Sequence, residues 1–307
     1  MHPQTTFVDG AGAAPDPNPA PNFFKFNTNG AQWMAGLGSY AYHTLGWRRA
    51  VTVVSSQSDA FWWAQTAAFD AEFCSLGGTI KRVWYPASLT DYSTVVAKVP
   101  SHGVDGVVVD NPYMLLALAK TDPQLRGNLS RKVVLTFAGP GTSLYPLGAR
   151  AAGIVAAGPT LPLPGADARP GLAPGARYRT AFTRAFPRIP KSVVGVFDVP
   201  YYNAMAATLQ ALDRVHGDLS GGERRFMAAL AKVTLDGPNG RISLDSKHLG
   251  IGPNYVWQLQ GPKLKPVVIR TIPRVDASFG GYFKATDPPP SKTTPACVKR
   301  TPPPWAR

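Results

Sequence analysis

The strongest constraint on the fold is the alternation of aliphatic runs and helical patterns between residues 50 and 137. Runs rich in Val, Ile and Leu are each followed by a stretch with helical periodicity. The predicted strands and helices, in chain order, are 50–55, 60–76, 80–85, 91–99, 104–109, 113–120 and 132–137. Strands that are apolar on both sides need cover on both faces of the sheet, and the intervening helices supply it. The segment therefore predicts an α/β fold with a parallel sheet flanked by helices.

The rest of the chain predicts a second lobe. Proline and glycine interrupt residues 156–191, and helical periodicity returns at 201–215 and 222–232. Residues 235–260 contain a Pro-Asn-Gly-Arg turn and then alternating large apolar side chains, which predicts strands. A length of 307 residues is enough for two domain-sized cores, so we expect two lobes with a crossing between them at 156–191.

The two ends of the chain give further expectations. The opening stretch, MHPQTTFVDGAGAAPDPNPAP, has no basic leader followed by an apolar run, so no export signal is recognisable. Residues 276–307 are rich in Pro, Lys and Thr, and we identify no core-forming segment in them, so this tail is expected to be poorly ordered. Cys74 and Cys297 are too few for a disulfide framework and lack metal-ligand spacing; two reduced thiols are favoured over a single bridge.

Composition and motifs argue against several classes of protein. No run reaches the roughly 18 apolar residues that a membrane-spanning helix needs. The net charge of +14 raises the question of nucleic acid, but no nucleic-acid-binding motif accompanies it, which favours a solvated basic surface. The 5 histidines have no metal-binding spacing, and there is neither a GxSxG elbow nor a GxxxxGK[ST] loop. We therefore expect that the chain is not an enzyme and that it binds neither a metal ion nor a cofactor.

In an open parallel sheet, ligands bind beyond the carboxyl ends of the strands. This rule selects loops that carry hydroxyls, amides and aromatic rings but few charges, which suits a small ligand that is held and released. The selected segments are 9–13, 55–61, 110–113, 137–141 and 198–202.

The paired tryptophans near the first of the helices are predicted to be structural. Trp62 shares a helical stripe with Thr66, Phe69 and Phe73, which predicts a core position. Trp63 lies on the neighbouring stripe with Ala67, Asp70 and Cys74 and is expected to be partly exposed. Residues 57–59 and Phe61, at the strand-to-helix junction, are either ligand contacts or plain loop.

An ordered series of motifs resembles a known family. The series comprises PNFFKFNTNGAQWMAGLGSYAYHTLGWRRAVTVV, AFDAEFCSLGGTI, YPASLTDYSTVVAKV, VDGVVV, YYNAMAATLQAL and LDGPNGRISLD. In order and spacing it resembles the type I periplasmic solute-binding proteins of branched-chain amino acid ABC transporters, the leucine-binding-protein fold. The resemblance implies two α/β lobes joined by three crossovers, with a ligand trapped as the lobes close. It places lobe one at 1–27 and 160–246 and lobe two at 28–159 and 247–275, followed by the tail.

Two departures from the family pattern are visible. Family members begin with a further stretch of lobe one that is not recognised here, so the chain looks N-terminally truncated and its lobe one incomplete. The lobe-two loop that carries an acid for the ammonium of an amino-acid ligand reads TFAGPG here, with no carboxylate. An amino-acid ligand is therefore in doubt, although Asp59 or Asp110 could substitute. Gly10, Ala11 and Gly12 match the carboxylate-gripping loop, and one of Tyr201 and Tyr202 is expected to face the ligand or to pack in the core.

The resemblance implies a solute-binding protein that works outside the cytoplasm. It would capture a small, apolar or aromatic-bearing ligand and pass it to an ABC transporter permease; no nucleic-acid partner and no membrane span are expected. A ligand sensor of the same fold without transport, a non-functional fragment and, less favoured, a basic nucleic-acid-binding protein remain alternatives. The predicted ligand-binding residues are Gly10, Ala11, Gly12, Gln57, Ser58, Asp59, Phe61, Asn111, Tyr113, Thr136, Phe137, Tyr201 and Tyr202.

Overall fold

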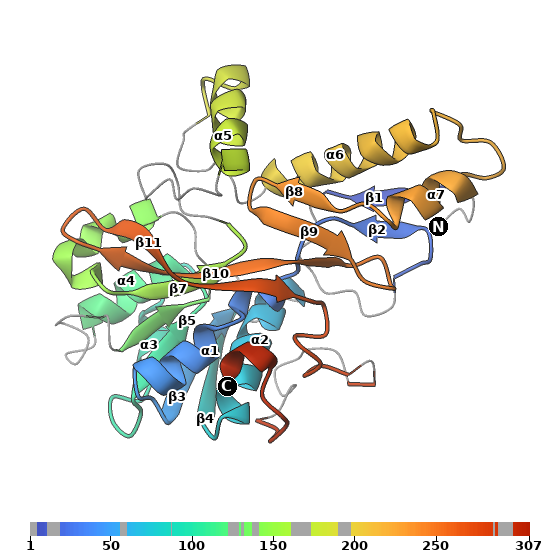
Figure 1. The fold of residues 1–307 in the computed structure, drawn as a ribbon. Coiled ribbons are helices and arrows are strands. Elements are labelled where there is room, and N and C mark those ends of the chain that lie inside the picture. Colours follow the sequence, from blue (N-terminus) through green and yellow to red (C-terminus); the bar gives the residue numbers. More distant parts are fainter. Residues whose placement is uncertain are drawn as a thin grey trace.

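A computed structural model gives the fold of the chain as two bodies of unequal size (Figure 1). It describes residues 5–10, 19–55, 60–86, 88–121, 129, 132–136, 141–160, 173–189, 198–284, 286–287 and 297–307. The larger body, lobe two, contains most of the predicted parallel sheet, and the smaller body, lobe one, contains the first two strands and the late helices. The α/β class predicted from the strand and helix periodicities is confirmed.

Lobe two is built on a parallel sheet whose strands lie in the order β4-β3-β5-β6-β7. Its elements, in chain order, are β3 (Arg49–Ser55), α2 (Ala60–Ser75), β4 (Thr79–Tyr85), α3 (Ser93–Val96), β5 (Gly106–Val109), α4 (Pro112–Thr121), β6 (Val133–Leu135), the 3-10 segment η4 (Gly141–Ala151) and β7 (Val155–Gly158). Each strand and helix predicted between residues 50 and 136 is therefore found, with ends that shift by a few residues.

The strands of lobe two bury both faces, as their unbroken apolar sequence requires. Val107 and Val109 pack in one core with Leu115 and Leu118 of α4, while Val108 packs in the other core with α2. Successive side chains of a strand point to opposite faces, so one aliphatic run serves two cores.

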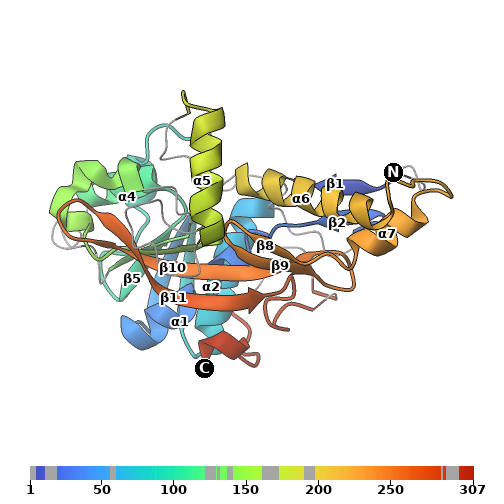
Figure 2. The same ribbon diagram turned by 45° about the horizontal axis from the view of Figure 1, so that its top comes forward.

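Two long antiparallel strands extend the sheet of lobe two towards lobe one. They are β10 (Gly250–Gln260) and β11 (Lys265–Val275). One part of β10 pairs with β7 in lobe two, and its first residues pair with β9 (Gly240–Leu244). Figures 1 and 2 show this ribbon running between the two bodies.

Lobe one contains a parallel pair, β1 (Phe7–Asp9) and β2 (Phe23–Lys25), and a short hairpin of β8 (Leu235–Gly237) with β9. Helices α6 (Asp198–Arg214) and α7 (Arg224–Leu230) cover it. Ala207, Ala211 and Leu230 of these helices pack in a separate hydrophobic core. The same core contains Phe24 of β2 and Phe26, which follows β2 directly. The helix α5 (Ala173–Ala185) projects upward in Figure 1 and contacts α6 through Tyr178.

The first crossover between the lobes is short and partly helical. It passes through η1 (Gln32–Met34), α1 (Leu37–Ser39) and the π-helical turn η2 (Tyr40–Thr44). The side-chain amide of Gln32 donates to the carbonyl oxygens of Gly250 and Val275, at 2.9 and 2.7 Å, so the first crossover is tied to both strands of the β10–β11 ribbon at the end next to β9. These buried bonds fix the connection between the lobes.

The C-terminal tail corrects two expectations. Phe279, Tyr282 and Ala306 are each at most 2% exposed, so the described residues of 276–307 are packed and the prediction of a poorly ordered tail is wrong for them. Cys297 forms a disulfide with Cys74 of α2, so the preference for reduced thiols is also wrong. The physical reason is the second face of α2, which needs apolar cover, and the few aromatic residues among the prolines supply it.

Candidate functional site

The carboxyl ends of β3 and β5 meet at one edge of lobe two because the two strands pair in parallel. The backbone N–H of Ser55, the last residue of β3, donates to Asp110 Oδ2 at 2.6 Å. Asp110 follows β5 directly and is 1% exposed. The edge is therefore organised around a buried carboxylate.

The second oxygen of Asp110 is also engaged within the chain. The hydroxyl of Tyr85, at the end of β4, donates to Asp110 Oδ1 at 2.6 Å, and Asn111 Nδ2 donates to the same oxygen at 3.1 Å. Burial raises the pKa of Asp110 to about 6, although the hydrogen bonds from Tyr85 and Ser55 oppose the shift. Burial and the neighbouring Asp110 raise the pKa of Tyr85. Asp110 thus links the ends of three strands, but none of its oxygens lacks an internal donor.

Asn111 uses its side chain for structure. Its Oδ1 accepts the backbone N–H of Met114 at 2.8 Å, which caps the first turn of α4, and its Nδ2 also donates to the Tyr85 hydroxyl. Both ends of the amide are therefore satisfied inside the protein. The prediction that Asn111 contacts the ligand remains a prediction, and its observed contacts are those of a cap.

Aromatic rings surround this network. Tyr85 and Tyr92 pack edge to face with 5.8 Å between ring centroids, and Tyr113, on the first turn of α4, is 62% exposed. Thr136, in contrast, is 1% exposed, and its hydroxyl donates to the carbonyl of Val109 at 3.4 Å. Among the predicted lobe-two residues that the structure describes, Tyr113 is thus the one with a side chain open to a ligand.

On lobe one, the predicted residue Gly10 lies against Tyr201, and the predicted residue Tyr202 lies against α5. A Cβ atom at Gly10 would lie 2.7 Å from Cδ1 of Tyr201, so the backbone of this loop lies against the tyrosine ring. Tyr202 packs against Tyr178 of α5, with 4.9 Å between ring centroids, and the Tyr178 hydroxyl donates to Asp198 at 2.6 Å. Tyr201 and Tyr202 are 59% and 49% exposed, so both rings remain available.

Several predicted positions lie outside the described residues. They are Ala11, Gly12, Gln57, Ser58, Asp59 and Phe137, together with the side chains of Phe61 and Trp62. Trp63 is described and is structural, as predicted: its Nε1 donates to the Ser55 carbonyl at 3.1 Å, and its ring packs on Trp84.

Sequence reasoning missed three tyrosines of this region. Tyr85 is the last residue of a predicted strand and could have been found by including strand ends in the search, and Tyr92 lies in a motif that contributed only to the family resemblance. Nothing in the sequence signals the contact between Tyr178 and Tyr202, because α5 and α6 are separated by a proline-rich stretch.

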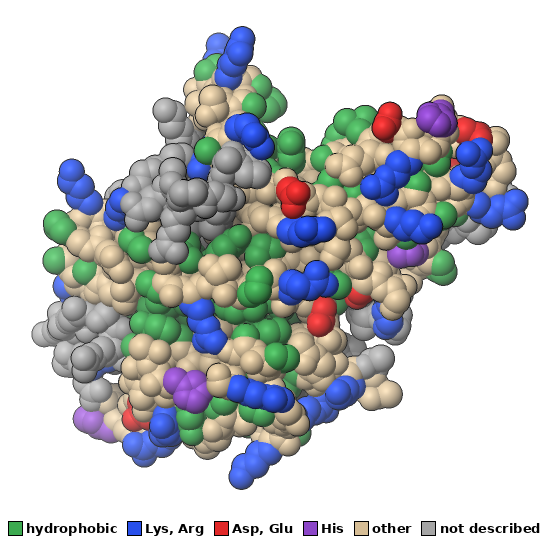
Figure 3. Space-filling view, viewed as in Figure 1, with side chains coloured by type: hydrophobic (Ala, Val, Ile, Leu, Met, Phe, Trp, Pro, Cys, Tyr) green, Lys and Arg blue, Asp and Glu red, His purple; other side chains and the backbone are tan. Residues whose placement is uncertain are grey.

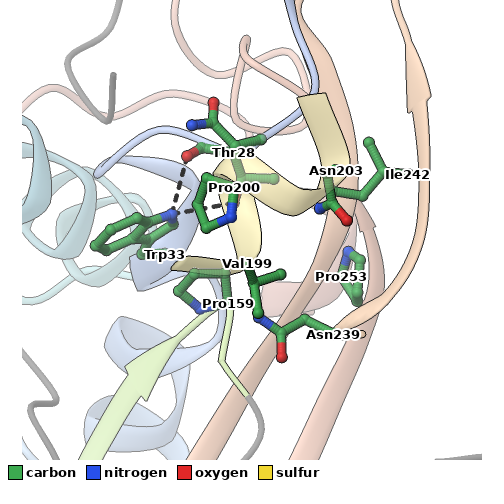
Figure 4. A pocket seen from close by; sticks show the side chains of 10 residues that line it. Thr28, Trp33, Pro159, Val199, Pro200, Asn203, Asn239, Ile242 and Pro253 are labelled. Carbon is green, nitrogen blue, oxygen red and sulfur yellow. Dashed lines mark hydrogen bonds between the residues drawn. The ribbon is translucent and has the colours of Figure 1, made fainter. Parts of the chain in front are cut away.

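A small cavity lies where the connections between the lobes converge (Figure 4). It encloses about 30 Å³ and is lined by residues such as Trp33, Pro159, Asn203 and Pro253. Trp33 Nε1 donates to both the carbonyl and the hydroxyl oxygen of Thr28, each at 3.0 Å, and so closes one wall. That space suits a single water molecule and is too small for an organic ligand.

Other kinds of site are not seen in the described parts of the chain. Within those ranges no helix is long and apolar enough to cross a membrane. No cluster of three or more His, Cys, Asp or Glu residues that could hold a metal ion occurs in the same ranges. Figure 3 shows the Lys and Arg side chains scattered over the visible face, in agreement with a solvated basic surface.

Comparisons with known proteins agree with this architecture. A family model described as periplasmic binding protein matches residues 3–263. No curated protein sequence matches the chain. An ABC transporter substrate-binding protein from Sphaerobacter thermophilus is similar in structure, with a TM-score of 0.67 and 20% identity, covering 83% of this chain and 68% of that one.

Two further solved structures are similar to this chain. A leucine-binding protein from Thermotoga maritima has a TM-score of 0.67 and 16% identity, covering 88% of this chain and 73% of that one. A solute-binding protein from R. palustris in complex with benzoate has a TM-score of 0.64 and 20% identity, covering 83% and 67%. The chain belongs to the periplasmic binding protein family and has the type I fold of ABC transporter substrate-binding proteins.

Proposed function

We propose that the chain captures a small, apolar or aromatic-bearing molecule between its two lobes and delivers it to the permease of an ABC importer. The observation that supports this class of ligand is that Asp110 makes its hydrogen bonds within the protein. Of the two acids that could bind a ligand ammonium, Asp59 lies outside the described residues, and the carboxylate of Asp110 accepts from Ser55, Tyr85 and Asn111 inside the protein. An amino-acid ligand would need such a charge-assisted bond to replace its lost hydration.

Among the predicted ligand-binding residues that the structure describes, the exposed large side chains are aromatic. Tyr113 on lobe two and Tyr201 and Tyr202 on lobe one offer ring faces and hydroxyls, which suit a flat apolar body with a polar group at its rim. Solved relatives of this fold include one in complex with benzoate and one in complex with 4-hydroxybenzoate. We infer that the ligand is of the small aromatic carboxylic acid class.

An extracytoplasmic location fits both the family and the disulfide that joins the C-terminal tail to α2. Members of the family are periplasmic binding proteins. The disulfide between Cys74 and Cys297 fits an oxidising compartment, since such bonds persist there and are rare in the cytosol.

Titration calorimetry with benzoate, 4-hydroxybenzoate and leucine tests the proposal. We expect saturable 1:1 binding of at least one aromatic acid, with little dependence on salt, and at least 10-fold weaker binding of leucine. Tyr113→Ala should weaken aromatic binding more than Tyr113→Phe does, because the phenylalanine keeps the ring face. Leucine binding as tight as that of the aromatic acids would refute the ligand class. Salt-dependent binding of an oligonucleotide with no small-molecule binding would refute the function.

A further inference from the structure

Helix α2 is buried on every side. Each residue from Ala64 to Cys74 is at most 5% exposed, including the polar Gln65, Asp70 and Glu72. A helix that packs on one face of a sheet normally keeps a polar stripe in water. Here the chain's own C-terminal end lies beside α2 and α1, as Figures 1 and 2 both show, and its aromatic residues pack with the apolar residues of α2. Among the polar residues, Glu72 contacts this end, whereas Asp70 pairs with Arg82 of β4.

Residues 297–307, which we call the C-terminal strap, are anchored along their length. Cys297 is bonded to Cys74, and the carbonyl oxygen of the adjacent Val298 accepts from the hydroxyl of Tyr282 at 2.9 Å. Arg300 makes two bonds to Asp287, at 2.5 and 2.7 Å. The strap is therefore a docked segment whose covalent tie joins residues 223 positions apart.

The far end of the strap reaches a buried carboxylate. Trp305 Nε1 donates to Glu72 Oε2 at 3.1 Å. Glu72 is 0% exposed, and burial raises its pKa. A buried carboxylate needs donors to remain charged, and the strap supplies one of them.

The same carboxylate holds the first crossover. The backbone N–H of Gly36 donates to Glu72 Oε2 at 2.9 Å, and that of Ser39 donates to Oε1 at 2.7 Å. Gly36 has a φ of 91°, a conformation that favours glycine and leaves its N–H directed at Glu72. Glu72 thus connects the strap directly to the segment that joins the two lobes.

A second residue makes the same connection. Arg270 of β11 donates to the Ser39 hydroxyl at 2.9 Å and to the carbonyl oxygen of Trp305. His43, in the turn that follows α1, lies 3.2 Å from the carbonyl oxygen of Ala306 through its Nε2. The end of the strap therefore touches the crossover through three side chains from different elements.

We propose that the C-terminal strap is a redox-controlled latch on the first crossover, closed by the Cys74–Cys297 bond and transmitted through Glu72. A dithiol reductant gives two electrons and two protons to the bond: the S–S bond breaks, Cys74 and Cys297 become thiols, and the reductant becomes a disulfide. The strap is then held by non-covalent contacts alone and opens more often. Each opening removes the Trp305 donor from Glu72 and loosens Gly36 and Ser39. This latch does not depend on the identity of the ligand.

Limited proteolysis tests the latch itself. Trypsin cleavage after Arg300 would release residues 301–307, a peptide that mass spectrometry detects directly. The native protein is compared with protein that has been reduced with dithiothreitol, alkylated and freed of reagent. We expect at least 10-fold faster release after reduction, and the same fast release from Cys297→Ser without any reductant. Equal rates in oxidised and reduced protein would overturn the proposal.

Hydrogen exchange tests the coupling to the crossover. We expect the amides of Gly36 and Ser39 to exchange at least 5-fold faster after reduction, while amides of β5, such as Val108, keep their rates. Trp305→Phe keeps the disulfide and an aromatic ring but removes the indole N–H that donates to Glu72. It should therefore speed exchange at Gly36 without releasing the peptide. Trp63→Phe, which removes an indole donor outside the strap, is the matched control and should leave Gly36 unchanged. Faster peptide release with unchanged exchange at Gly36 and Ser39 would overturn the coupling to the crossover.

Discussion

The two lobes differ in how completely their helices are buried. In lobe two, α2 lies between a complete sheet and the C-terminal strap, and no residue from Ala64 to Cys74 exceeds 5% exposure. In lobe one, α6 buries Ala204, Ala207 and Ala211 but leaves a large apolar stripe in solvent. Met205 and Leu209, one helical turn apart, are 60% and 59% exposed.

The difference follows from how much sheet each helix has to cover. The described sheet of lobe two has a run of five parallel strands, β4-β3-β5-β6-β7, whereas the parallel part of lobe one is the pair β1 and β2. A parallel sheet is stable when helices cover both faces, so a pair of strands offers α6 only a narrow surface. Packing in lobe two is therefore expected to dominate stability, and the exposed stripe of α6 is expected to contribute little.

The largest expected effect comes from the core around α2. Phe73→Ala removes a ring that is 0% exposed and stacks on Phe69, so it should lower the free energy of unfolding by about 3 to 5 kcal/mol. Phe186→Ala removes a ring that is 53% exposed and should change it by less than about 0.5 kcal/mol. Urea titration measures both. Similar losses from the two variants would show that the contrast in burial does not govern stability.

The second effect is the pH dependence that Asp110 imposes on lobe two. Burial raises its pKa to about 6, so the folded state binds this proton more tightly than the unfolded chain does. The stabilisation is fully present below about pH 4 and is lost as the pH rises through about 6, a total of about 2 to 3 kcal/mol. The difference in unfolding free energy between the native protein and Asp110→Asn should therefore fall from pH 4 to pH 7.

Asp218, beyond the end of α6 in lobe one, is the control for this prediction. Hydrogen bonds from Ser220 hold the pKa of its exposed carboxyl below the usual range, the opposite direction from Asp110. Asp218→Asn should therefore give a difference that does not fall between pH 4 and pH 7. A flat difference for Asp110→Asn over the same range would contradict the raised pKa.

A smaller effect is expected at the cap of α4. Asn111→Ala removes the acceptor for the Met114 N–H and a donor to Asp110, and should cost about 1 to 2 kcal/mol. Asn111→Ser keeps a side-chain oxygen for the cap and should recover part of that loss. Thermal unfolding of the three proteins gives the order. If Ser were no better than Ala, the cap would not be the source of the cost.

The sequence predicted the elements of lobe two well because each strand there is a short aliphatic run between helical patterns. It predicted the surroundings of α2 poorly. Asp70 and Cys74 lie on a stripe that periodicity assigns to a partly exposed face, yet they are 1% and 3% exposed. Cys74 is bonded to Cys297, far along the chain, and Asp70 pairs with Arg82 of β4, and helical periodicity carries no information about either partner.

The candidate site shows the same limit. The rule for parallel sheets correctly placed Asp110 and Asn111 at a strand end, and the family resemblance selected Thr136, but neither could say where these side chains point. Thr136 turns into the core, and Asn111 turns back to cap α4. Side-chain direction at a strand end depends on the hydrogen-bond donors that neighbouring strands bring, and Tyr85 and Ser55 are brought by tertiary structure.

The smallest expected effect lies on the exposed stripe of α6. Met205→Lys places a charge where the side chain already meets solvent, so the free energy of unfolding should change by less than about 0.5 kcal/mol. The same substitution two residues later, Ala207→Lys, puts the charge at a position that is 0% exposed and should prevent lobe one from packing. Circular dichroism during urea titration compares the two. A large loss of stability from Met205→Lys would mean that the stripe is covered in solution. The helices α2 and α6 would then be equally buried, and the two lobes would differ only in what covers each helix.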